Sequence, residues 1–221
     1  MSEWEEHNQL RLNPTKCQSI SFHRSRQAIH YTYHLDSADL RRVSEIKDLG
    51  VFLDTKLTFN AHVDRIIAKC RSTLGLVNRF AKDFGDPAIH KTLYCALVRF
   101  NLDYASPIWF PYHEVHVQRI QLIQKRFLMS FLGRQRLPGS FALPPYRERL
   151  KVCNLDRIED RHNLACIMVI YDCLMGRIKS PGLKRRIRIN NNRRGRRSRY
   201  LLEERHRNNY GRFEPLNKCT K

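Results

Sequence analysis

The chain has 221 residues, of which 42% are hydrophobic and 10% aromatic, so it can form the core of one domain or of two small ones and is not disordered throughout. Lysine and arginine outnumber the acidic residues 41 to 21, and the net charge of +20 favours a polyanionic partner, nucleic acid before an anionic membrane. No run approaches the roughly 18 apolar residues of a membrane span, and the acidic N-terminal segment lacks the apolar core of a signal peptide. We therefore expect an intracellular protein, nuclear or cytoplasmic, without a membrane partner.

Seven cysteines are scattered along the chain with no Cys-x-x-Cys pair, which favours a reducing compartment over a disulfide framework or a zinc ribbon. His162 and Cys166 are four residues apart, and Cys173 follows two helical turns later. These three side chains could ligate zinc, but no fourth ligand is evident. We expect them to pack in the core, and we assign no metal site.

The N-terminal part of the chain has the pattern of strands and turns. Asn13-Pro14 ends a short N-terminal helix. Residues 17–22 and 29–35 alternate with a period of two, which predicts two strands. The apolar run 49–53 predicts another strand with Gly50 inside it, and a glycine there is typical of a bulge or of a close approach by another backbone. Together these segments predict a small antiparallel sheet.

From Asn60 onward the apolar period changes from two to about 3.6, which predicts helices. Asn60 is the expected N-cap of the first. Its apolar stripe consists of Val63, Ile66, Ile67, Cys70, Leu74 and Val77. A second helix begins with Asp86 as N-cap and Pro87 as first residue, and ends near Tyr104. Its apolar positions are Ile89, Leu93, Leu97 and Phe100.

Three further helices are predicted, at residues 114–132, at residues 146–152 and from Asp156 to Gly176, the last with Gly176 as its C′ residue. For the 114–132 helix we expect one face to carry Val117, Ile120, Gln124, Phe127 and Phe131. For the 156–176 helix we expect Leu164, Ile167, Met168, Tyr171, Leu174 and Met175 to face inward. The fold class is therefore α+β: a small antiparallel sheet followed by a helical bundle.

Residues 183–221 differ in composition from the rest of the chain. They hold 14 lysines and arginines against 3 acids, a net +11 of the chain's +20. Such a segment buries too little apolar surface to order itself, so we expect a flexible basic extension that binds phosphates without sequence preference. It also fits a nuclear localisation signal. The predicted phosphate contacts are Arg193, Arg194, Arg196, Arg197 and Arg199.

Six segments, taken in order, resemble one known family. They are Trp4 with Asn8 to Cys17, Ile46 to Asp54, Leu57 to Val63, Leu97 to Arg99 with Tyr104 to Ser106 and Trp109, Ile123 to Leu128, and Asn209 to Gly211 with Glu214-Pro215. The chain thereby resembles the C-terminal part of the reverse transcriptases of non-LTR retrotransposons, of the jockey-like, LINE-type group. The first segment resembles motif D of the palm, the second the primer grip (motif E), and the third the entry into the thumb.

The resemblance implies RNA-directed DNA synthesis by the complete enzyme. In that enzyme, carboxylates of the palm hold two Mg²⁺ ions, and two of these carboxylates belong to a Phe/Tyr-x-Asp-Asp turn. This chain contains no Asp-Asp dipeptide, no CCHC knuckle, and Phe100 where the family usually has proline. Asp48 and Asp54 lie roughly 20 Å apart along a strand, which is too far for them to bind the same two Mg²⁺ ions. We therefore expect a fragment that starts after the metal-binding turn, has no activity and needs no cofactor by itself.

The same resemblance divides the chain into a palm-edge segment (1–56), a helical thumb or connection domain (57–182) and the basic extension (183–221). Lys16 corresponds to the motif D lysine, which in the family is proposed to protonate the leaving pyrophosphate; the alternative is a surface lysine. The primer grip corresponds to Leu49, Gly50 and Val51; the alternative is an ordinary bulge in an edge strand.

His62, in the first turn of the first thumb helix, could meet a phosphate at the helix N-terminus; the alternative is a histidine of the capping region. Two basic sets could line the duplex-facing side of the thumb; the alternative is that both are solvated helix faces. The first set is Lys69, Arg71 and Arg79, and the second is Lys125, Arg126, Arg134 and Arg136.

The first hypothesis is therefore a reverse transcriptase fragment that binds RNA, DNA or their hybrid without catalysis, in an unknown oligomeric state. The alternative is a basic nuclear nucleic-acid-binding protein that reuses these helices, or a remnant of the element without function. A third hypothesis, a nuclease, rests only on scattered histidines and acids.

Overall fold

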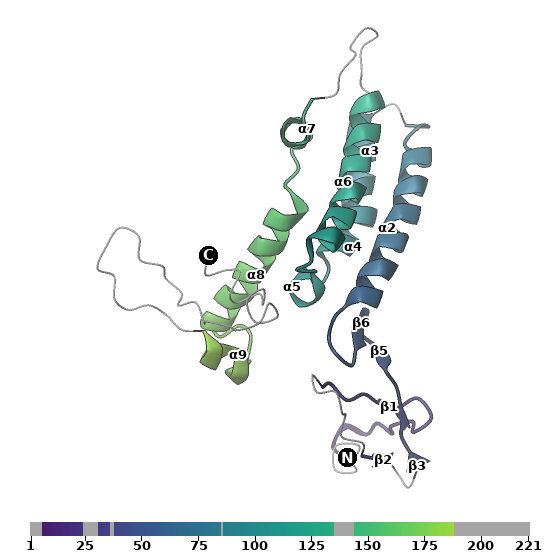
Figure 1. The fold of residues 1–221 in the computed structure, drawn as a ribbon, viewed down its shortest axis with the longest axis vertical. Helices are drawn as coiled ribbons and strands as arrows, with labels where there is room; N and C mark the ends of the chain where they lie inside the picture. Colours follow the sequence, from purple (N-terminus) through teal and green to yellow (C-terminus); the bar gives the residue numbers. More distant parts are fainter. Residues whose placement is uncertain (1–5, 24–30, 36–37, 85, 135–143, 188–221) are drawn as a thin grey trace, which may run out of the picture. The chain divides into compact units, whose positions relative to one another are not determined.

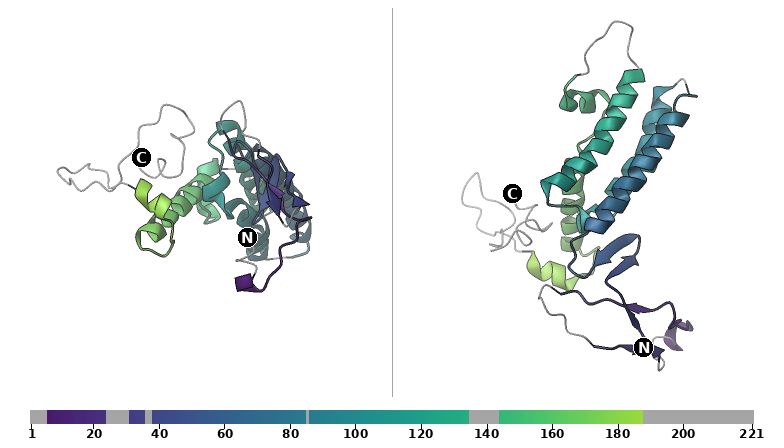
Figure 2. Two further views of the ribbon diagram at one scale, coloured as in Figure 1. Left: turned by 90° about the horizontal axis from the view of Figure 1, so that it is seen from below. Right: turned by 45° about the vertical axis from the view of Figure 1, so that its right-hand side comes forward.

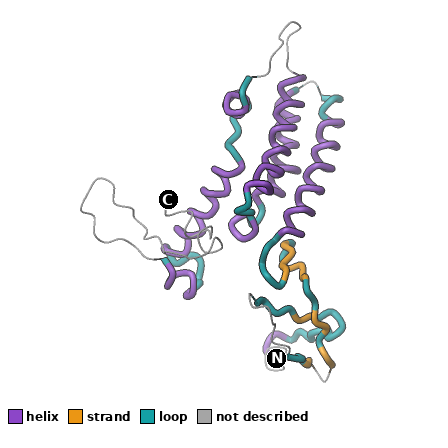
Figure 3. Tube along the Cα trace, viewed as in Figure 1, coloured by secondary structure: helices purple, strands orange, loops and turns teal. Residues whose placement is uncertain are grey.

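The computed structural model describes residues 6–23, 31–35, 38–84, 86–134 and 144–187. The chain divides into two compact units, Met1–His62 and Val63–Lys221, which are described separately. Figure 3 shows that the described strands belong to the first unit and that the second is helical. The predicted α+β class, with strands near the N-terminus followed by helices, is confirmed.

The first unit contains three two-stranded ladders among its described residues. These ladders are β1 (Gln18–Ser19) with β4 (Arg41–Arg42), β2 (His34–Leu35) with β3 (Ala38–Asp39), and β5 (Glu45–Asp48) with β6 (Val51–Asp54). The second and third are antiparallel as predicted, but the first is parallel. The strands are also shorter than the alternation predicted. Tyr31 and Tyr33 remain exposed and pack edge to face on each other, with ring centroids 5.0 Å apart.

The β5–β6 hairpin corrects the prediction of a strand with an internal glycine. Leu49 and Gly50 form a two-residue turn, with φ angles of 43° and 88°, between Asp48 and Val51. Positive φ at both central residues is the requirement of a type I′ turn, whose twist matches that of the flanking strands. The glycine is therefore selected by the turn and not by a bulge inside a strand.

Asp54, the last residue of β6, organises the loop that follows. Its carboxylate accepts hydrogen bonds from the backbone N–H groups of Lys56, Thr58 and Phe59 and from the Thr58 hydroxyl, at 2.9–3.1 Å. Partial burial raises the pKa of this carboxyl, but the hydrogen bonds from Thr58, Phe59 and Lys56 outweigh it, so the pKa is lowered. Helix α2 then begins at Asn60. Asn60 is therefore the first helical residue and not the N-cap that the sequence predicted.

The second unit is a bundle of helices. Their bounds are α2 (Asn60–Phe80, which begins at the end of the first unit), α3 (Pro87–Leu93), the π-helix η1 (Tyr94–Arg99), α4 (Phe100–Asp103), α5 (Ser106–Trp109), α6 (Glu114–Arg134), α7 (Tyr146–Val152), α8 (Ile158–Leu174) and α9 (Pro181–Arg186). Helices α2 and α6 run side by side and point the same way, with the α3–α4 segment returning between them in sequence (Figures 1 and 2).

Two predicted helix ends are confirmed by their hydrogen bonds. Asp86 caps α3, its carboxylate accepting from the Ala88 N–H at 2.8 Å, and Pro87 is the first helical residue. At the other end of the unit, Gly176 has φ 76° and follows α8. The Gly176 N–H donates to the Cys173 carbonyl at 3.2 Å, and the Arg177 N–H donates to the Asp172 carbonyl at 2.9 Å. This is the Schellman pattern, which satisfies two terminal carbonyls.

The core of the bundle lies between α2, α3, η1 and α6. The stripe predicted for α2 is buried, apart from the half-buried Ile66. The face predicted for α6 is buried as well. At the centre, the rings of Tyr94 and Phe127 stack with centroids 3.8 Å apart and planes 8° from parallel. Trp109, from α5, is also buried and donates its indole N–H to the Tyr104 carbonyl at 2.7 Å.

The face predicted for the second helix is wrong. Ile89, Leu97 and Phe100 are exposed, and the helix buries His90, Tyr94, Val98 and Leu102 instead. These four positions are spaced by four residues, more than the 3.6 of an α-helix. The π-helical segment η1 accommodates this spacing, because its wider turns keep every fourth residue on one side.

The inward face predicted for α8 is also wrong. The side chains of Leu164, Ile167, Met168, Tyr171 and Met175 are 42–60% exposed, and only Leu174 of the predicted set is half-buried. The helix buries Ile158, His162, Cys166, Ile170 and Cys173 instead. Both faces of α8 are apolar, so the period alone could not select the one that packs against α4 and α5.

Residues 183–186, placed in the basic extension from sequence, form part of α9, which packs against α8. The Ser180 hydroxyl caps this helix by accepting from the Leu183 N–H at 3.4 Å. The predicted phosphate contacts Arg193, Arg194, Arg196, Arg197 and Arg199 lie outside the described residues.

Candidate nucleic-acid interface

The predicted primer-grip residues occupy the tip of the β5–β6 hairpin. Leu49 is 84% exposed and Gly50 is exposed, whereas Val51 is buried. A leucine with positive φ is uncommon, and a large apolar side chain at an exposed tip gains little from burial. The tip therefore presents both backbone and apolar surface outward. Lys16, the motif D lysine by resemblance, is exposed in the same unit.

His62 does not have the exposed position that a phosphate contact needs. Its side chain is only 2% exposed, and Nδ1 accepts the Phe52 N–H at 3.3 Å. Its ring lies 6.2 Å from that of Phe52, centroid to centroid. This bond joins the first turn of α2 to strand β6, so the geometry gives His62 a structural contact in place of the predicted ligand contact.

The two acids of the hairpin do not fit a pair of Mg²⁺ ions. Asp48 is paired with Val51 beside the turn, whereas Asp54 is paired with Glu45 at the open end. The Asp54 carboxylate is already occupied by the loop that follows it. Within the described ranges, no group of three or more His, Cys, Asp or Glu side chains could hold a metal ion. Cys166 and His162 contact each other, Sγ to Nε2 at 3.6 Å, inside the core.

Polar contacts tie α2 to α6 at both ends of the pair. Near the start of α2, Arg119 forms an ion pair with Asp64 at 2.8 Å. Near its end, the Ser130 hydroxyl donates to Asn78 Oδ1 at 3.0 Å, and Arg134 donates to the Asn78 carbonyl. Because the contacts advance in the same direction along both helices, α2 and α6 lie parallel.

The spacing of these contacts places Arg71 and Arg126 across from each other. Arg71 is seven residues, about two turns, from both Asp64 and Asn78, so all three lie on one edge of α2. Arg126 is likewise two turns beyond Arg119 on α6. Both arginines are exposed, and neither has a hydrogen bond or ion pair to another residue that the structure describes.

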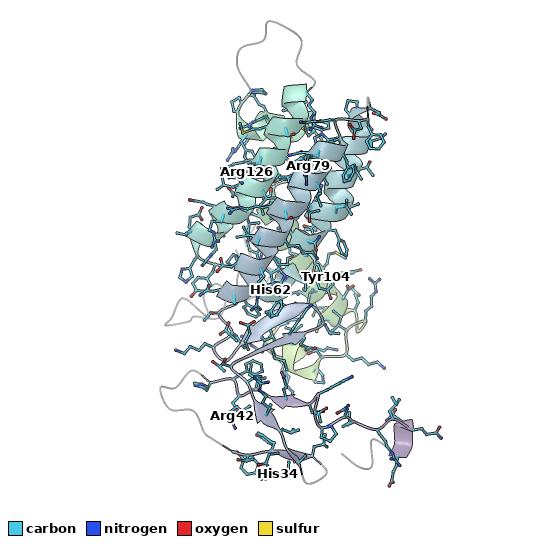
Figure 4. The ribbon with its side chains drawn as sticks, turned by 90° about the vertical axis from the view of Figure 1, so that its right-hand side faces the viewer. His34, Arg42, His62, Arg79, Tyr104 and Arg126 are labelled. Carbon is cyan, nitrogen blue, oxygen red and sulfur yellow. The ribbon has the colours of Figure 1, made fainter. Side chains whose placement is uncertain are left out.

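This arrangement joins two residues from the two basic sets, which the sequence treated separately. We name the strip that contains Arg71 and Arg126, bounded by Arg119 and Arg134, the α2–α6 edge. Figure 4 shows Arg79 and Arg126 towards the same end of the bundle. The sequence reasoning missed Arg119, although its seven-residue spacing from Arg126, matching that of Asp64 and Arg71, was a usable signal.

The other predicted contacts face elsewhere. Lys69 is two residues from Arg71, which is about 200° around the helix, so it lies on the far side of α2. Arg79 is exposed and lies between these two directions. Lys125 is half-buried and lies over the Tyr146 ring of α7, with Nζ 5.3 Å from the centroid. Of the predicted cations that the structure describes in this unit, Arg71 and Arg126 lie on the α2–α6 edge and Arg134 bounds it. Arg136 lies outside the described residues.

His90 closes the core beside the end of the edge. Its Nε2 lies 3.0 Å from Asn78 Oδ1, which can only accept, so Nε2 carries the proton. Burial, and secondly the positive charge of Arg134, lower the pKa of His90 to about 4. The imidazole is therefore neutral at physiological pH and holds Asn78 in place without adding charge.

Comparison with known proteins gives a similarity over part of the chain. The chain is 27% identical over 137 residues, 60% of its length, to a Drosophila melanogaster protein described as "Probable RNA-directed DNA polymerase from transposon X-element". The match spans 15% of the length of that relative. No family model and no solved structure matches the chain. The similarity supports an origin related to retrotransposon reverse transcriptases. Within the described residues, no helix is long and apolar enough to cross a membrane.

Proposed function

We propose that this chain is the C-terminal segment of a non-LTR retrotransposon reverse transcriptase, comprising the palm edge, thumb and basic extension. Two similarities of the sequence support it. The six ordered segments resemble that family, and the relative described as an RNA-directed DNA polymerase matches 137 residues. The chain's own role in this proposal is to bind RNA, DNA or an RNA–DNA hybrid.

The α2–α6 edge is the observation that carries the binding role. Two exposed arginines, Arg71 and Arg126, lie on this edge, one from each of the neighbouring helices. Guanidinium groups donate in a fork that fits phosphate oxygens, and their charge is retained at every physiological pH. Asp64 is the acid that contacts this edge in the structure, and it pairs with Arg119. Arg71 and Arg126 are thus available to a phosphate backbone.

The hairpin tip extends the proposal to the first unit. An exposed Gly50 lets a nucleic-acid backbone approach the chain closely, and the exposed Leu49 offers apolar contact beside it. In the proposal this tip serves as the primer grip, and Lys16 is a further cation of the same unit. The Arg-rich segment 193–199 adds phosphate attraction without sequence preference and serves as a nuclear localisation signal.

The test is an affinity titration across salt with a recessed primer–template, a blunt duplex and a single strand. Removing one arginine–phosphate interaction should reduce the salt slope by about one, so Arg71→Gln combined with Arg126→Gln should reduce it by about two. The matched control is Lys69→Gln, an exposed cation on the far side of α2. If all three nucleic acids bind equally and the double variant binds as the parent does, the thumb-like role is refuted.

The proposal also includes the absence of catalysis by this chain alone, because the metal-binding Asp-Asp pair of the family is missing from its sequence. Primer extension with purified chain, Mg²⁺ and deoxynucleotides should show no added nucleotide. Measurable extension would refute this part and leave the binding role intact.

A second candidate is a basic nuclear protein that binds nucleic acid only through its extension, favoured by the net +11 of residues 183–221. Deletion of residues 188–199 separates the two. Loss of all affinity on deletion supports the second candidate, whereas retained preference for the primer–template supports the thumb.

A further inference from the structure

A cavity of about 440 Å³ lies where α2 and α6 end and α3 begins. Its volume is within the range of roughly 300–1,000 Å³ that small-ligand sites have. The buried part of its lining is aromatic, because His90 and Phe131 lie there with ring centroids 5.6 Å apart. Phe84 lines the cavity as well and is half-exposed, so its ring is accessible to a planar ligand.

The charged part of the lining carries a net single positive charge. Lys82 and Arg134 supply two cations, and Asp86 supplies one carboxylate, which accepts the Ala88 N–H. His90 adds no charge, because burial lowers its pKa to about 4. Lys82 is exposed and forms no ion pair with another residue in the described part of the chain. An aromatic cavity with one excess positive charge suits a ligand that combines a planar ring with one phosphate.

The cavity continues the α2–α6 edge. Arg134 belongs to both, because it lines the cavity and also donates to the Asn78 carbonyl at the end of the edge. That bond uses one of the five N–H donors of the guanidinium, so the others remain available to a ligand. Arg134 is eight residues, roughly 12 Å, beyond Arg126 along α6. At about 3.4 Å per nucleotide, a strand that contacts Arg126 reaches the cavity within about four nucleotides.

We propose that the cavity receives one unpaired base of a single strand whose backbone follows the α2–α6 edge. The base stacks on Phe84, and its phosphate lies at Arg134 and Lys82. Aromatic side chains stack on any base, so this contact needs no particular sequence. The chain's own residues 135–143 suit the cavity less well, because Arg136 would add a cation where an anion is needed. The inference rests on the proposed function, because that edge positions the strand.

An affinity titration of the full chain with two recessed primer–templates tests the inference. One has an ordinary single-stranded overhang, and the overhang of the other is abasic with the same phosphates. The ordinary overhang should bind about fivefold more tightly or better, because only it can stack. Equal binding of the two overturns the inference and leaves the proposed function intact. If neither binds, the proposed function fails and the inference fails with it.

Substitution of Phe84 locates the contact. Phe84→Ala should remove the advantage of the ordinary overhang and leave the affinity for the abasic one unchanged, whereas Phe84→Tyr should keep the advantage. The matched control is Phe100→Ala, another exposed phenylalanine, about 15 Å further than His90 along the same run of helix. A Phe84→Ala variant that still prefers the ordinary overhang overturns the inference. Circular dichroism checks that each variant is folded.

The phosphate part of the contact has its own test. Lys82→Gln should reduce the salt slope by about one with either overhang, and an unchanged slope would overturn the placement of the phosphate. Adenosine monophosphate distinguishes a base within a strand from a free nucleotide. It should compete only weakly, because it makes no contact with the rest of the edge. Competition by the free nucleotide at the same concentration as the overhang would overturn the assignment to a strand.

Discussion

Helices α2 and α8 are both long and belong to the same bundle, but their outer surfaces are different. The outer surface of α2 carries charges, and its edge towards α6 is tied by Asp64 and Asn78. The outer surface of α8 carries Leu164, Met168 and Tyr171. One helix presents exposed cations, and the other presents exposed apolar side chains. The bundle therefore has two different kinds of outer surface on two of its helices.

The buried faces of α2 and α8 differ the other way round: that of α2 is the more apolar of the two. Beyond His62 in its first turn, the buried face of α2 consists of aliphatic side chains and Cys70, whereas that of α8 includes His162 and two cysteines. Phe110 stacks on His162 with ring centroids 4.1 Å apart, so an aromatic contact covers the less apolar side of α8. The difference shows that the more apolar face of a helix need not be the one that its own bundle buries.

The largest effect expected from this difference is in stability. Ile67→Ala on the buried face of α2 should lower the free energy of unfolding by about 2–5 kcal/mol, because it leaves a cavity. Ile167→Ala on the outer face of α8 should cost less than about 1 kcal/mol, because that side chain is half-exposed. Urea unfolding measures both losses. Equal losses would mean that the outer face of α8 is packed within one chain.

A pH effect of up to about 3 kcal/mol is expected where α3 meets α2 and α6. His90 has a pKa of about 4 in the folded chain and about 6.5 unfolded, so only the unfolded chain takes up a proton between these values. The stability that neutral His90 contributes is complete above pH 6.5 and decreases as the pH falls towards 4.

Urea unfolding between pH 7 and pH 4 measures this decrease. His90→Gln should flatten the profile, and His113→Gln, at an exposed position, should leave it as in the parent. A parent profile with no slope between pH 6.5 and 4 would contradict the buried, neutral state of His90.

The smallest effect concerns the polar attachment of α8. Arg161 donates from Nε and Nη2 to the Asp103 carboxylate of α4, at 3.0 and 2.6 Å, and both side chains are partly buried. Asp103→Asn should cost about 1–2 kcal/mol of unfolding free energy. Asp172→Asn is the control, because its partner Arg177 is mostly exposed and such pairs contribute about 0–1 kcal/mol. A destabilisation by the control as large as that of Asp103→Asn would contradict this ranking.

Local signals predicted the helices and several of their ends correctly. Asp86 before Pro87 and Gly176 after α8 act through their own backbone geometry, so no neighbour is needed to interpret them. The stripe of α2 was also predictable, because that helix has a single apolar face.

The candidate site was only partly predictable. The sequence picked out Arg71 and Arg126 as basic residues, but it placed them in two separate sets. It also assigned His62 to the nucleic acid, whereas the structure buries it against β6. The hairpin is a second example. Gly50 indicated an unusual backbone conformation, but glycine is favoured both in tight turns and in bulges, so the sequence could not tell which of the two forms there.

The sequence by itself determined the order of strands and helices, the positive charge and the resemblance to reverse transcriptases, because each depends on residues close together in the chain or on their order. Tertiary structure alone decided that Arg71 and Arg126 share an edge and that α8 exposes Leu164, Met168 and Tyr171. Those outcomes depend on which helices become neighbours. A helix with two apolar faces fixes neither its neighbours nor the side that remains open.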